Sequence, residues 1–500
     1  MRDDALNFTT APVIVKACHG LLLPVGLFLY YRASPFSFLL SHFSFLKMDR
    51  REFLKIVGIT SATTAGLYSC APKKGAELSS KELGPVPTDQ MTYRTFPGLG
   101  DDRPSLLGYG CMRWPTIPNP NGEGNMIDQD AVNELVDYAI AHGVNYFDTS
   151  PVYVQGWSEK ATGNALKRHP RGSFYISTKL SNFSDYTREN SLAMYRQSFK
   201  DLQVDYIDYY LLHSIGGGGM DAFRRRYVDN GMLDFLVEER KAGRIRRLGW
   251  SFHGSKEVFD EMLALHDQYH WDFVLIQMNY VDWHIAKGSG IGAKYLYEEL
   301  EKRGIPVQIM EPLLGGRLSK VPDHVVALLK EKDPERSVAS WAFRFAGTPK
   351  GVMTVLSGMT YKEHLEDNIR SYAPLVPLTE EENEFLFHAA KLMEQYPTIP
   401  CNYCAYCMPC PYGIDIPSIF MYYNKCVNEG NVAESRQDPN YKEARRAFLV
   451  GYDRAIEKLR QADHCIGCGK CSKHCPQNIR IPRELHRIDK FVEQLKQDTL

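Results

Sequence analysis

Two short runs of cysteines near the C-terminus constrain the fold of this chain more than any other feature. The first run is Cys401-x2-Cys404-x2-Cys407-x2-Cys410-Pro411, and the second is Cys465-x2-Cys468-x2-Cys471-x3-Cys475-Pro476. Thiolates spaced in this way on a tight turn can bind three corners of one iron–sulfur cubane, while the cysteine before the proline can reach a second cubane. The segments after the runs also match, since Cys410-Pro-Tyr-Gly-Ile-Asp-Ile-Pro parallels Cys475-Pro-Gln-Asn-Ile-Arg-Ile-Pro. The pattern predicts a paired site for two 4Fe–4S clusters in residues 401–500.

We expect the ligands to cross between the two runs. One cluster would take Cys401, Cys404, Cys407 and Cys475, and the other would take Cys465, Cys468, Cys471 and Cys410. Cys426 is a further candidate, because the spacing before Cys410 is short. The alternative is a pair of structural zinc sites, but zinc ribbons usually separate two CxxC pairs rather than packing four cysteines into one run. Clusters are therefore favoured over zinc.

The composition supports metal ligation in a protein of more than one domain. Nine of the twelve cysteines lie in the last hundred residues, whereas a disulfide scaffold would scatter them through its loops. The formal net charge of −1 excludes charge-driven binding of nucleic acid. The length of 500 residues exceeds what one ordinary core needs.

The first 91 residues are expected to carry a targeting signal and a linker rather than a folded domain. Translation is expected to start at Met48, which would make residues 1–47 an erroneous extension; a short membrane anchor is the alternative. Residues 48–70 resemble a twin-arginine signal, with Arg50-Arg51 before Phe-Leu-Lys and a weakly apolar stretch. The ending Leu67-Tyr68-Ser69-Cys70 resembles a lipobox, in which Cys70 would become a lipid anchor. Residues 71–91 have the composition of a tether. The protein is expected to be exported, as a periplasmic or membrane-anchored lipoprotein, or cytoplasmic if the signal is not used.

Short β-rich runs alternate with amphipathic stretches over residues 92–377. The predicted strands are Leu106–Met112, Val144–Thr149, Phe174–Lys179, Tyr206–His213, Ile245–Ser251, Phe273–Asn279, Pro306–Glu311 and Gly351–Leu356. Amphipathic stretches include Gln129–His142, Arg188–Leu202 and Lys256–Tyr269. Eight such alternations predict an α/β fold, a (β/α)8 TIM barrel, in preference to a doubly wound sheet. A helical connector is expected at residues 378–400, and the segment Ser418–Asp463 between the cysteine runs is also expected to be helical.

Polar residues recur at the C-terminal ends of the predicted strands. They are Asp148, Lys179, His213, Ser251, Gln277 and Asn279. Any one of them is explained by a helix cap or a satisfied core group. The C-terminal strand ends of a barrel converge on one face, however, so their shared position predicts an active site there.

Three of these strands resemble signatures of the aldo/keto reductase family. They are Gly143-Val-Asn-Tyr-Phe-Asp-Thr-Ser-Pro-Val-Tyr153 with Ser158-Glu159, Ile176-Ser-Thr-Lys179, and Asp205-Tyr-Ile-Asp-Tyr-Tyr-Leu-Leu-His213. The resemblance implies that Tyr153 is the general acid and that His213 orients the substrate carbonyl. It also implies that Lys179, held by Asp148, lowers the pKa of the Tyr153 phenol.

The same resemblance implies a nicotinamide cofactor, NADP or NAD. Ser251 and Gln277 match positions that hold the nicotinamide carboxamide. The segment Ser357-Gly358 to Asn368 resembles the loop and helix that bind the adenosine phosphate, with Asp367 and Asn368 at the adenine contacts. Phe252, Met310 and His364 depart from the family pattern. Because His364 replaces an arginine that often binds the 2′-phosphate, the choice between NADP and NAD stays open.

The C-terminal region resembles helical two-cluster ferredoxin modules, including those fused to bacterial aldo/keto reductases. We therefore expect an iron–sulfur oxidoreductase that interconverts a small carbonyl compound and an alcohol and exchanges electrons with a redox partner protein. Two alternatives stay open. The clusters could be structural in an ordinary carbonyl reductase, or the barrel could be a non-catalytic scaffold in an electron-transfer or interaction subunit.

Overall fold

The computed structural model describes residues 84–500 except 121, 123 and 287. The expected start at Met48, the twin-arginine signal and Cys70 lie outside the described residues, as does most of the tether. Within the described part of the chain, no helix is both long enough and apolar enough to span a bilayer.

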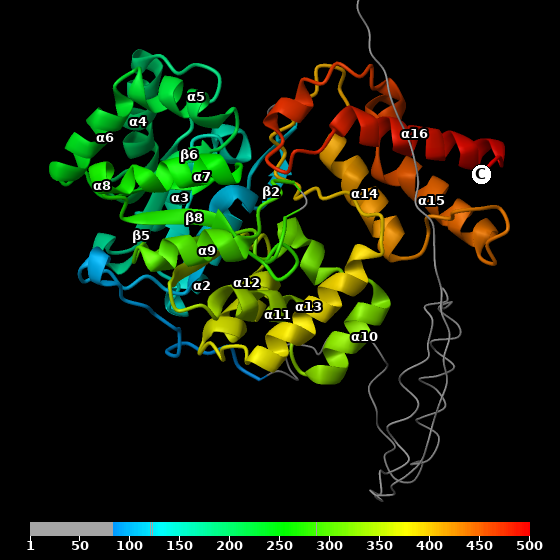
Figure 1. Ribbon diagram of the computed structural model, residues 1–500, viewed down its shortest axis with the longest axis horizontal. Helices are drawn as coiled ribbons and strands as arrows, with labels where there is room; N and C mark the ends of the chain where they lie inside the picture. The colour runs from blue at the N-terminus through cyan, green and yellow to red at the C-terminus, as the bar shows by residue number, and fades with distance from the viewer. Residues whose placement is uncertain (1–83, 121, 123, 287) are drawn as a thin grey trace, which may run out of the picture. The chain divides into compact units, whose positions relative to one another are not determined.

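Eight parallel strands close into a barrel in the order β1-β10-β9-β8-β7-β6-β5-β4 (Figure 1). The strands are β1 Leu107–Gly110, β4 Tyr146–Asp148, β5 Tyr175–Leu180, β6 Ile207–Ile215, β7 Ile245–Phe252, β8 Phe273–Gln277, β9 Val307–Met310 and β10 Val352–Ser357. The pairing of Leu107 with Val355 and of Gly108 with Tyr146 joins β1 to both β10 and β4. The predicted (β/α)8 barrel is therefore confirmed, and a doubly wound sheet is excluded because the sheet has no open edge.

The barrel helices begin where the sequence supplies caps. Asp128 accepts a hydrogen bond from the backbone N–H of Ala131 and starts α2, and Thr187 caps α4 in the same way. The helices are α2 Gln129–Ala141, α3 Ser158–Leu166, α4 Arg188–Leu202, α5 Gly219–Phe223, α6 Met232–Lys241, α7 Lys256–Ala264, α8 His266–Tyr269, α9 Ala293–Lys302, α10 Asp323–Lys332, α11 Val338–Gly347 and α12 Lys362–Tyr372. The stretch predicted as one helix over 256–269 is divided at Leu265 into α7 and α8.

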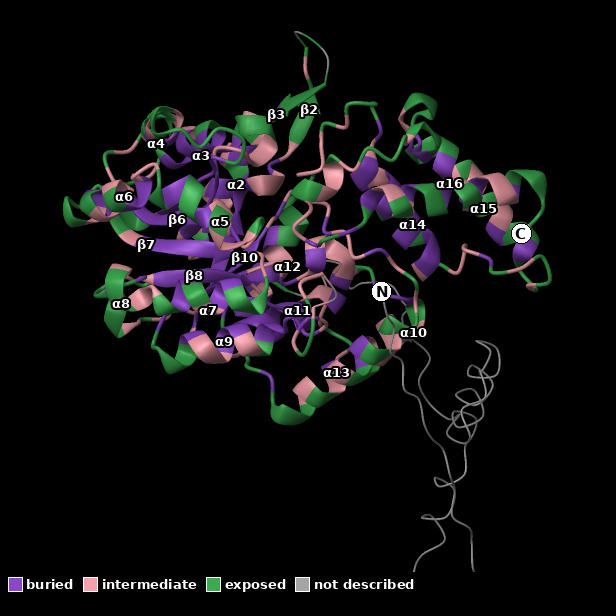
Figure 2. Cartoon of the chain, turned by 45° about the horizontal axis from the view of Figure 1, so that its top comes forward, coloured by how far each residue is buried: buried purple, intermediate pink, exposed green. Residues whose placement is uncertain are grey.

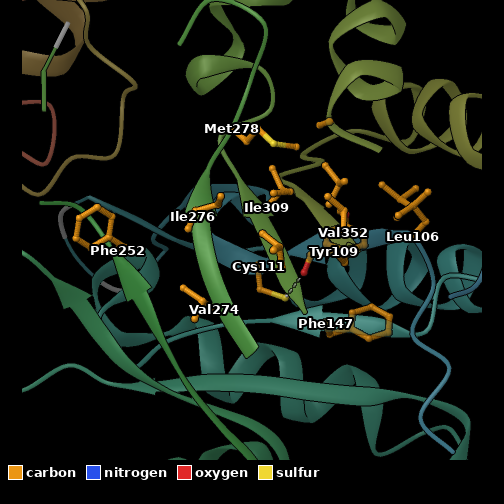
Figure 3. Packing of buried hydrophobic residues seen from close by; sticks show 14 of the residues in the cluster. Leu106, Tyr109, Cys111, Phe147, Phe252, Val274, Ile276, Met278, Ile309 and Val352 are labelled. Carbon is orange, nitrogen blue, oxygen red and sulfur yellow. Dashed lines mark hydrogen bonds between the residues drawn. The ribbon is translucent and has the colours of Figure 1, made fainter. Parts of the chain in front are cut away.

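The strands are buried on both faces. All four residues of β1 and all six of β10 are buried, as expected for a parallel sheet covered by helices. Figure 3 shows side chains from several strands, among them Val274, Ile276 and Ile309, within one hydrophobic cluster. Interior residues such as Tyr209 and Phe273 form a second cluster inside the barrel. This packed ring fixes the strand ends, and therefore the residues that follow them.

A small hairpin was not predicted from the sequence. Strands β2 Thr116–Pro118 and β3 Asn125–Ile127 pair antiparallel after β1. They are largely exposed (Figure 2), and each is too short to produce an alternating pattern of apolar residues.

The C-terminal region is a small, mainly helical domain with its own core. Helix α13 Glu380–Glu394 connects it to the barrel, and a capping box of Thr379 and Glu382 starts this helix. The domain helices are α14 Ile416–Asn428, α15 Tyr441–Ala455 and α16 Ile481–Gln497. Each cysteine run precedes an Ile-Pro pair that opens a helix, α14 or α16. The internal repeat seen in the sequence thus corresponds to two loop–helix units.

Removing a central aromatic ring should destabilise the barrel. Phe259 on α7 is fully buried, and its ring lies against Trp250 and Phe252, with centroids 5.6 and 5.0 Å away. Phe259→Ala should lower the free energy of unfolding by about 3–5 kcal/mol, measured by chemical denaturation. In the control Ile117→Ala, on the exposed hairpin, the change should stay within about 0.5 kcal/mol. Equal losses in both variants would contradict the packing described.

Candidate functional site

Lys179 and Asp148 form a buried ion pair at the C-terminal end of the barrel. The Lys179 Nζ donates to Asp148 Oδ1 at 2.6 Å and to the carbonyl oxygen of Thr149 at 2.8 Å. Ser177 donates to the other carboxylate oxygen at 2.7 Å. The side chains are only 1% and 3% exposed. Two charges this deep need such additional hydrogen bonds to offset their loss of water.

Tyr153 and His213 stand beside this pair, so the four predicted catalytic residues meet. Tyr153 lies in the turn that follows β4, and its ring centre is 5.0 Å from the Lys179 Nζ. The Tyr153 and His213 rings are 6.0 Å apart and nearly perpendicular. Burial lowers the pKa of His213 well below its usual value, so the imidazole is neutral near pH 7. Its Nδ1 lies 2.6 Å from the Ser181 hydroxyl; when that hydroxyl donates, the ring proton is on Nε2.

The expected lowering of the pKa of Tyr153 is wrong for this structure. Burial raises the pKa of the phenol well above its usual value, and the neighbouring Tyr406 and Asp148 raise it further. Lys179 does not offset this, because its ammonium is bonded to Asp148 and Thr149. Tyr153 is therefore a protonated acid in the state described.

Tyr406 is a residue of this site that the sequence did not reveal. It belongs to the C-terminal domain, between Cys404 and Cys407. Its hydroxyl lies 3.4 Å from Nε2 of His213 and also interacts electrostatically with the Tyr153 phenol. A tyrosine between two ligand cysteines has no sequence signal for a contact across domains, so only the fold places it here.

The two residues predicted to hold the nicotinamide end lie on adjacent strands but engage protein groups. The Ser251 hydroxyl accepts from the backbone N–H of Ser214 at 2.7 Å. The Gln277 amide donates to Asp282 at 2.5 Å, and its oxygen accepts from Gln477 at 2.9 Å. These bonds use one of the two amide donors and one of the two lone pairs of Gln277. Gln277 thus keeps capacity for a carboxamide, beside a pocket that Phe252, Asp282 and Gln477 also line.

The predicted adenosine-end residues form a second group. Ser357 ends β10 and accepts from the Asn368 amide on α12 at 2.8 Å, and both side chains are buried. Gly358 follows, and a Cβ at this position would lie 2.8 Å from the side chain of Arg113. Asp367 accepts from the Ser337 hydroxyl at 2.6 Å. Asp367 thus bonds to α11, whereas Ser357 and Asn368 form one hydrogen-bonded unit at the barrel mouth.

Both cysteine loops reach the barrel at Glu311. This residue follows β9 with φ of 56°, and its carboxylate accepts from the Asn402 amide and, at 3.4 Å, from Gln477. Burial raises the pKa of Glu311 to about 8. Asn402 follows Cys401 and Gln477 follows Pro476, so each cysteine run supplies one contact. Glu311 ended a predicted strand but was not among the polar strand ends singled out, and Asn402 and Gln477 look like ordinary polar loop residues.

The cysteines fall into the two crossed groups that the sequence suggested. Cys401, Cys404, Cys407 and Cys475 line one pocket. Burial raises the pKa of Cys401 to about 11 and of Cys407 to about 12, and repulsion from Cys475 adds to both. Cys410, Cys465, Cys468 and Cys471 likewise interact with one another. Thiolates gathered in this way require positive charge among them, which an iron–sulfur cluster supplies.

Cys426 and the zinc alternative fit less well. Cys426 is buried in the core of the C-terminal domain beside Tyr422, and the groups that act on its thiol are Tyr422, Glu429 and Lys425 rather than other cysteines. Among the described residues, no group of three or more His, Cys, Asp or Glu side chains is arranged to hold a single metal ion. The packing of four cysteines into one short run still favours a cluster over a zinc ribbon, which separates two CxxC pairs.

Known proteins resemble both parts of the chain. The aldo/keto reductase family model matches residues 106–386, and the 4Fe-4S dicluster domain model matches residues 400–480. L-galactose dehydrogenase of Arabidopsis thaliana is 25% identical over 310 residues, which is 58% of this chain and 91% of that protein. Glyoxal reductase of Bacillus subtilis is 28% identical over 233 residues, covering 46% and 74% of the two chains.

Two solved structures are similar at lower identity. An aldo-keto reductase from Bacillus halodurans in its holo form is 23% identical, with a TM-score of 0.48, covering 60% of this chain and 96% of that one. An aldo-keto reductase from Klebsiella pneumoniae in complex with NADPH is 19% identical, with a TM-score of 0.47, covering 61% and 96%. From the family match over more than half of its length, this chain belongs to the aldo/keto reductase family, and it carries a C-terminal 4Fe–4S dicluster domain.

Proposed function

We propose that this protein is an iron–sulfur oxidoreductase that interconverts a small carbonyl compound and an alcohol with NADP or NAD. In the same proposal, two 4Fe–4S clusters exchange electrons with a redox partner protein. The observation that carries it is the meeting of Tyr153, His213 and the Lys179–Asp148 pair at one end of the barrel. The names of the relatives, a dehydrogenase and a glyoxal reductase, agree with this class of reaction.

The residues have complementary roles in the proposed reaction. The nicotinamide, when bound, supplies or accepts the hydride. Tyr153 gives its phenolic proton to the carbonyl oxygen, and the raised pKa ensures that this proton is present beforehand. The Nε2–H of neutral His213 donates a hydrogen bond to the same oxygen. The Lys179 ammonium, 5.0 Å from the phenol ring centre, stabilises the phenolate that remains.

The two cysteine groups would hold clusters that differ in how near they lie to the barrel and to the solvent. Cys401, Cys404, Cys407 and Cys475 would hold the cluster beside Glu311 and the barrel mouth. Cys410, Cys465, Cys468 and Cys471 would hold the other, which we assign to contact with the redox partner because Cys468 is exposed. The clusters, when bound, supply one-electron transfer.

One observation favours a second function. Tyr406 stands at the hydroxyl of Tyr153 and the Nε2 of His213, and Gln477 binds the amide of Gln277. A barrel closed in this way could serve as a scaffold in an electron-transfer or interaction subunit. Carbonyl turnover separates the two functions.

The proposed acid can be tested by removing one oxygen atom. Tyr153→Phe should lower the rate of carbonyl reduction by about 10²–10⁴-fold, because only the transferable proton is lost. NADPH oxidation is the assay, and cofactor affinity and iron content should match the wild type. Tyr186→Phe, at an exposed tyrosine outside the four proposed catalytic residues, is the control and should keep full activity. Undiminished turnover in Tyr153→Phe would favour the scaffold.

Iron analysis tests the ligand groups. Protein purified without oxygen should carry about eight iron atoms per chain, and Cys475→Ser should lose about half of them because one cubane loses a ligand. The matched control Cys426→Ser should keep all its iron, since Cys426 lies in the hydrophobic core. Stoichiometric zinc in place of iron, or equal iron loss in both variants, would refute the assignment.

Export and lipid anchoring stay predictions from the sequence. Changing Arg50 and Arg51 together to Lys should leave the unprocessed protein in the cytoplasm, because a twin-arginine signal requires the paired arginines. Fractionation and immunoblotting measure this, and the mass of the mature N-terminus tests lipidation of Cys70. Unchanged export of the double variant would refute the signal.

A further inference from the structure

We propose that Tyr406 is part of the carbonyl-binding pocket and determines which substrates enter it. The inference rests on the proposed carbonyl chemistry at Tyr153 and His213, and adds a residue supplied by the C-terminal domain. Its basis is the position of one oxygen atom. The Tyr406 hydroxyl lies 3.4 Å from His213 Nε2 and interacts electrostatically with the Tyr153 phenol.

Those two contacts mark the place that a substrate oxygen needs. A carbonyl oxygen that receives the proton of Tyr153 and a hydrogen bond from His213 must lie within about 2.6–3.2 Å of both donors. The Tyr406 oxygen lies 3.4 Å from His213 Nε2, next to this position, so a substrate oxygen and the Tyr406 hydroxyl compete for the same space. The Tyr406 hydroxyl therefore blocks the substrate pocket, and a substrate displaces this hydroxyl before it reacts.

Aromatic packing holds the Tyr406 ring in this position. Its centroid is 6.3 Å from Phe183 and 6.3 Å from His213. Phe183 in turn lies 5.0 Å from the His213 ring and carries the Arg226 guanidinium at 4.8 Å from its centre. The pocket wall beside the reacting oxygen is thus built from both domains.

The backbone of the Tyr406 loop has little freedom to withdraw. Arg113 donates to the carbonyl oxygen of Asn402 at 3.0 Å, and the Asn402 amide binds Glu311. Gly315 packs so closely that a Cβ at its position would lie 2.2 Å from the same Asn402 oxygen. Cys404 and Cys407, the proposed cluster ligands, flank Tyr406 on both sides. Rotation of the Tyr406 side chain, with the loop held, is the motion that admits a substrate.

The size of the substrate follows from this arrangement. A small aldehyde needs only the space released when the hydroxyl end of Tyr406 moves aside. A bulky carbonyl compound needs the volume of the ring itself, because Phe183 and His213 bound the same space. Tyr406 therefore weakens the binding of all carbonyl substrates and weakens that of bulky ones most.

Two substitutions separate the hydroxyl from the ring. Tyr406→Phe removes the hydroxyl that contacts His213, and should lower KM for acetaldehyde roughly fivefold, since a neutral hydrogen bond is worth about 1 kcal/mol. Tyr406→Ala should lower KM for benzaldehyde by more than for acetaldehyde, by at least tenfold as a rough expectation. The kcat should stay within about twofold, because Tyr153 remains the acid. Tyr403→Phe, in the same loop and beside Arg113, is the matched control and should leave KM unchanged.

A binding measurement accompanies the kinetics. Benzoate, an unreactive carboxylate of the shape of benzaldehyde, is titrated calorimetrically into the full-length, cluster-loaded protein with NADP+ present. Its Kd should fall by a similar factor in Tyr406→Ala and not in the Tyr403 control. Iron content is measured in every variant, and if Tyr406→Ala loses iron, Tyr406→Phe decides the outcome.

Several results would overturn the inference. They are an unchanged or higher KM in the Tyr406 variants, unchanged benzoate affinity, or a kcat reduced by about 10²-fold, which would make Tyr406 a proton donor. Failure of the proposed function has a different signature. The wild type and all variants would then reduce no carbonyl, while benzoate would still bind more tightly to Tyr406→Ala. In that case Tyr406 is confirmed as the residue that blocks the pocket, and the pocket serves a different reaction.

Discussion

The buried ion pair between Lys179 and Asp148 is the constraint around which the end of the barrel is arranged. Charges that are almost fully withdrawn from water are stable only where hydrogen bonds replace the lost water. Besides their mutual bond, Lys179 donates to Thr149 and Asp148 accepts from Ser177. The pair joins adjacent strands β4 and β5, so it fixes the turn that carries Tyr153. An ammonium satisfied in this way leaves the phenol protonated and stabilises negative charge only when the proton has left. This balance suits the role of general acid that the sequence implied for Tyr153, although without the lowered pKa that was expected.

The C-terminal domain is built into this site and is more than an appended electron carrier. Asn402 from the first cysteine loop and Gln477 from the second both bind Glu311 at the end of β9. Gln477 also binds Gln277, and Tyr406 reaches His213. Ligation at the first cysteine group and the shape of the barrel mouth therefore involve the same backbone segments. The two loops thus share one buried carboxyl group, that of Glu311.

Electrostatics explains why these loops need their metal. Cys401 and Cys407 lie in a pocket with Cys475, where burial and mutual repulsion raise their pKa values, so the free thiols stay protonated. A cluster, when bound, would supply the positive charge that favours the thiolate forms. The helical core around Phe448 and Ile488 holds the loops in their repeated arrangement.

Much of this protein could be predicted because its signals are local. The apolar pattern located all eight barrel strands to within about two residues. Apolar runs and helix caps depend only on neighbouring residues in the chain, so they can be recognised without the tertiary structure. Cysteine spacing likewise located both ligand groups. Tyr406, Asn402, Gln477 and Glu311 could not be found in this way, because their roles arise from contacts between distant segments, which lie 200 residues apart for Gln477 and Gln277. The pKa of Tyr153 was also mispredicted, since burial beneath another domain is a property of the folded chain. The sequence by itself determined the barrel strands and the cysteine groups. Only tertiary packing decided how one domain closes over the other.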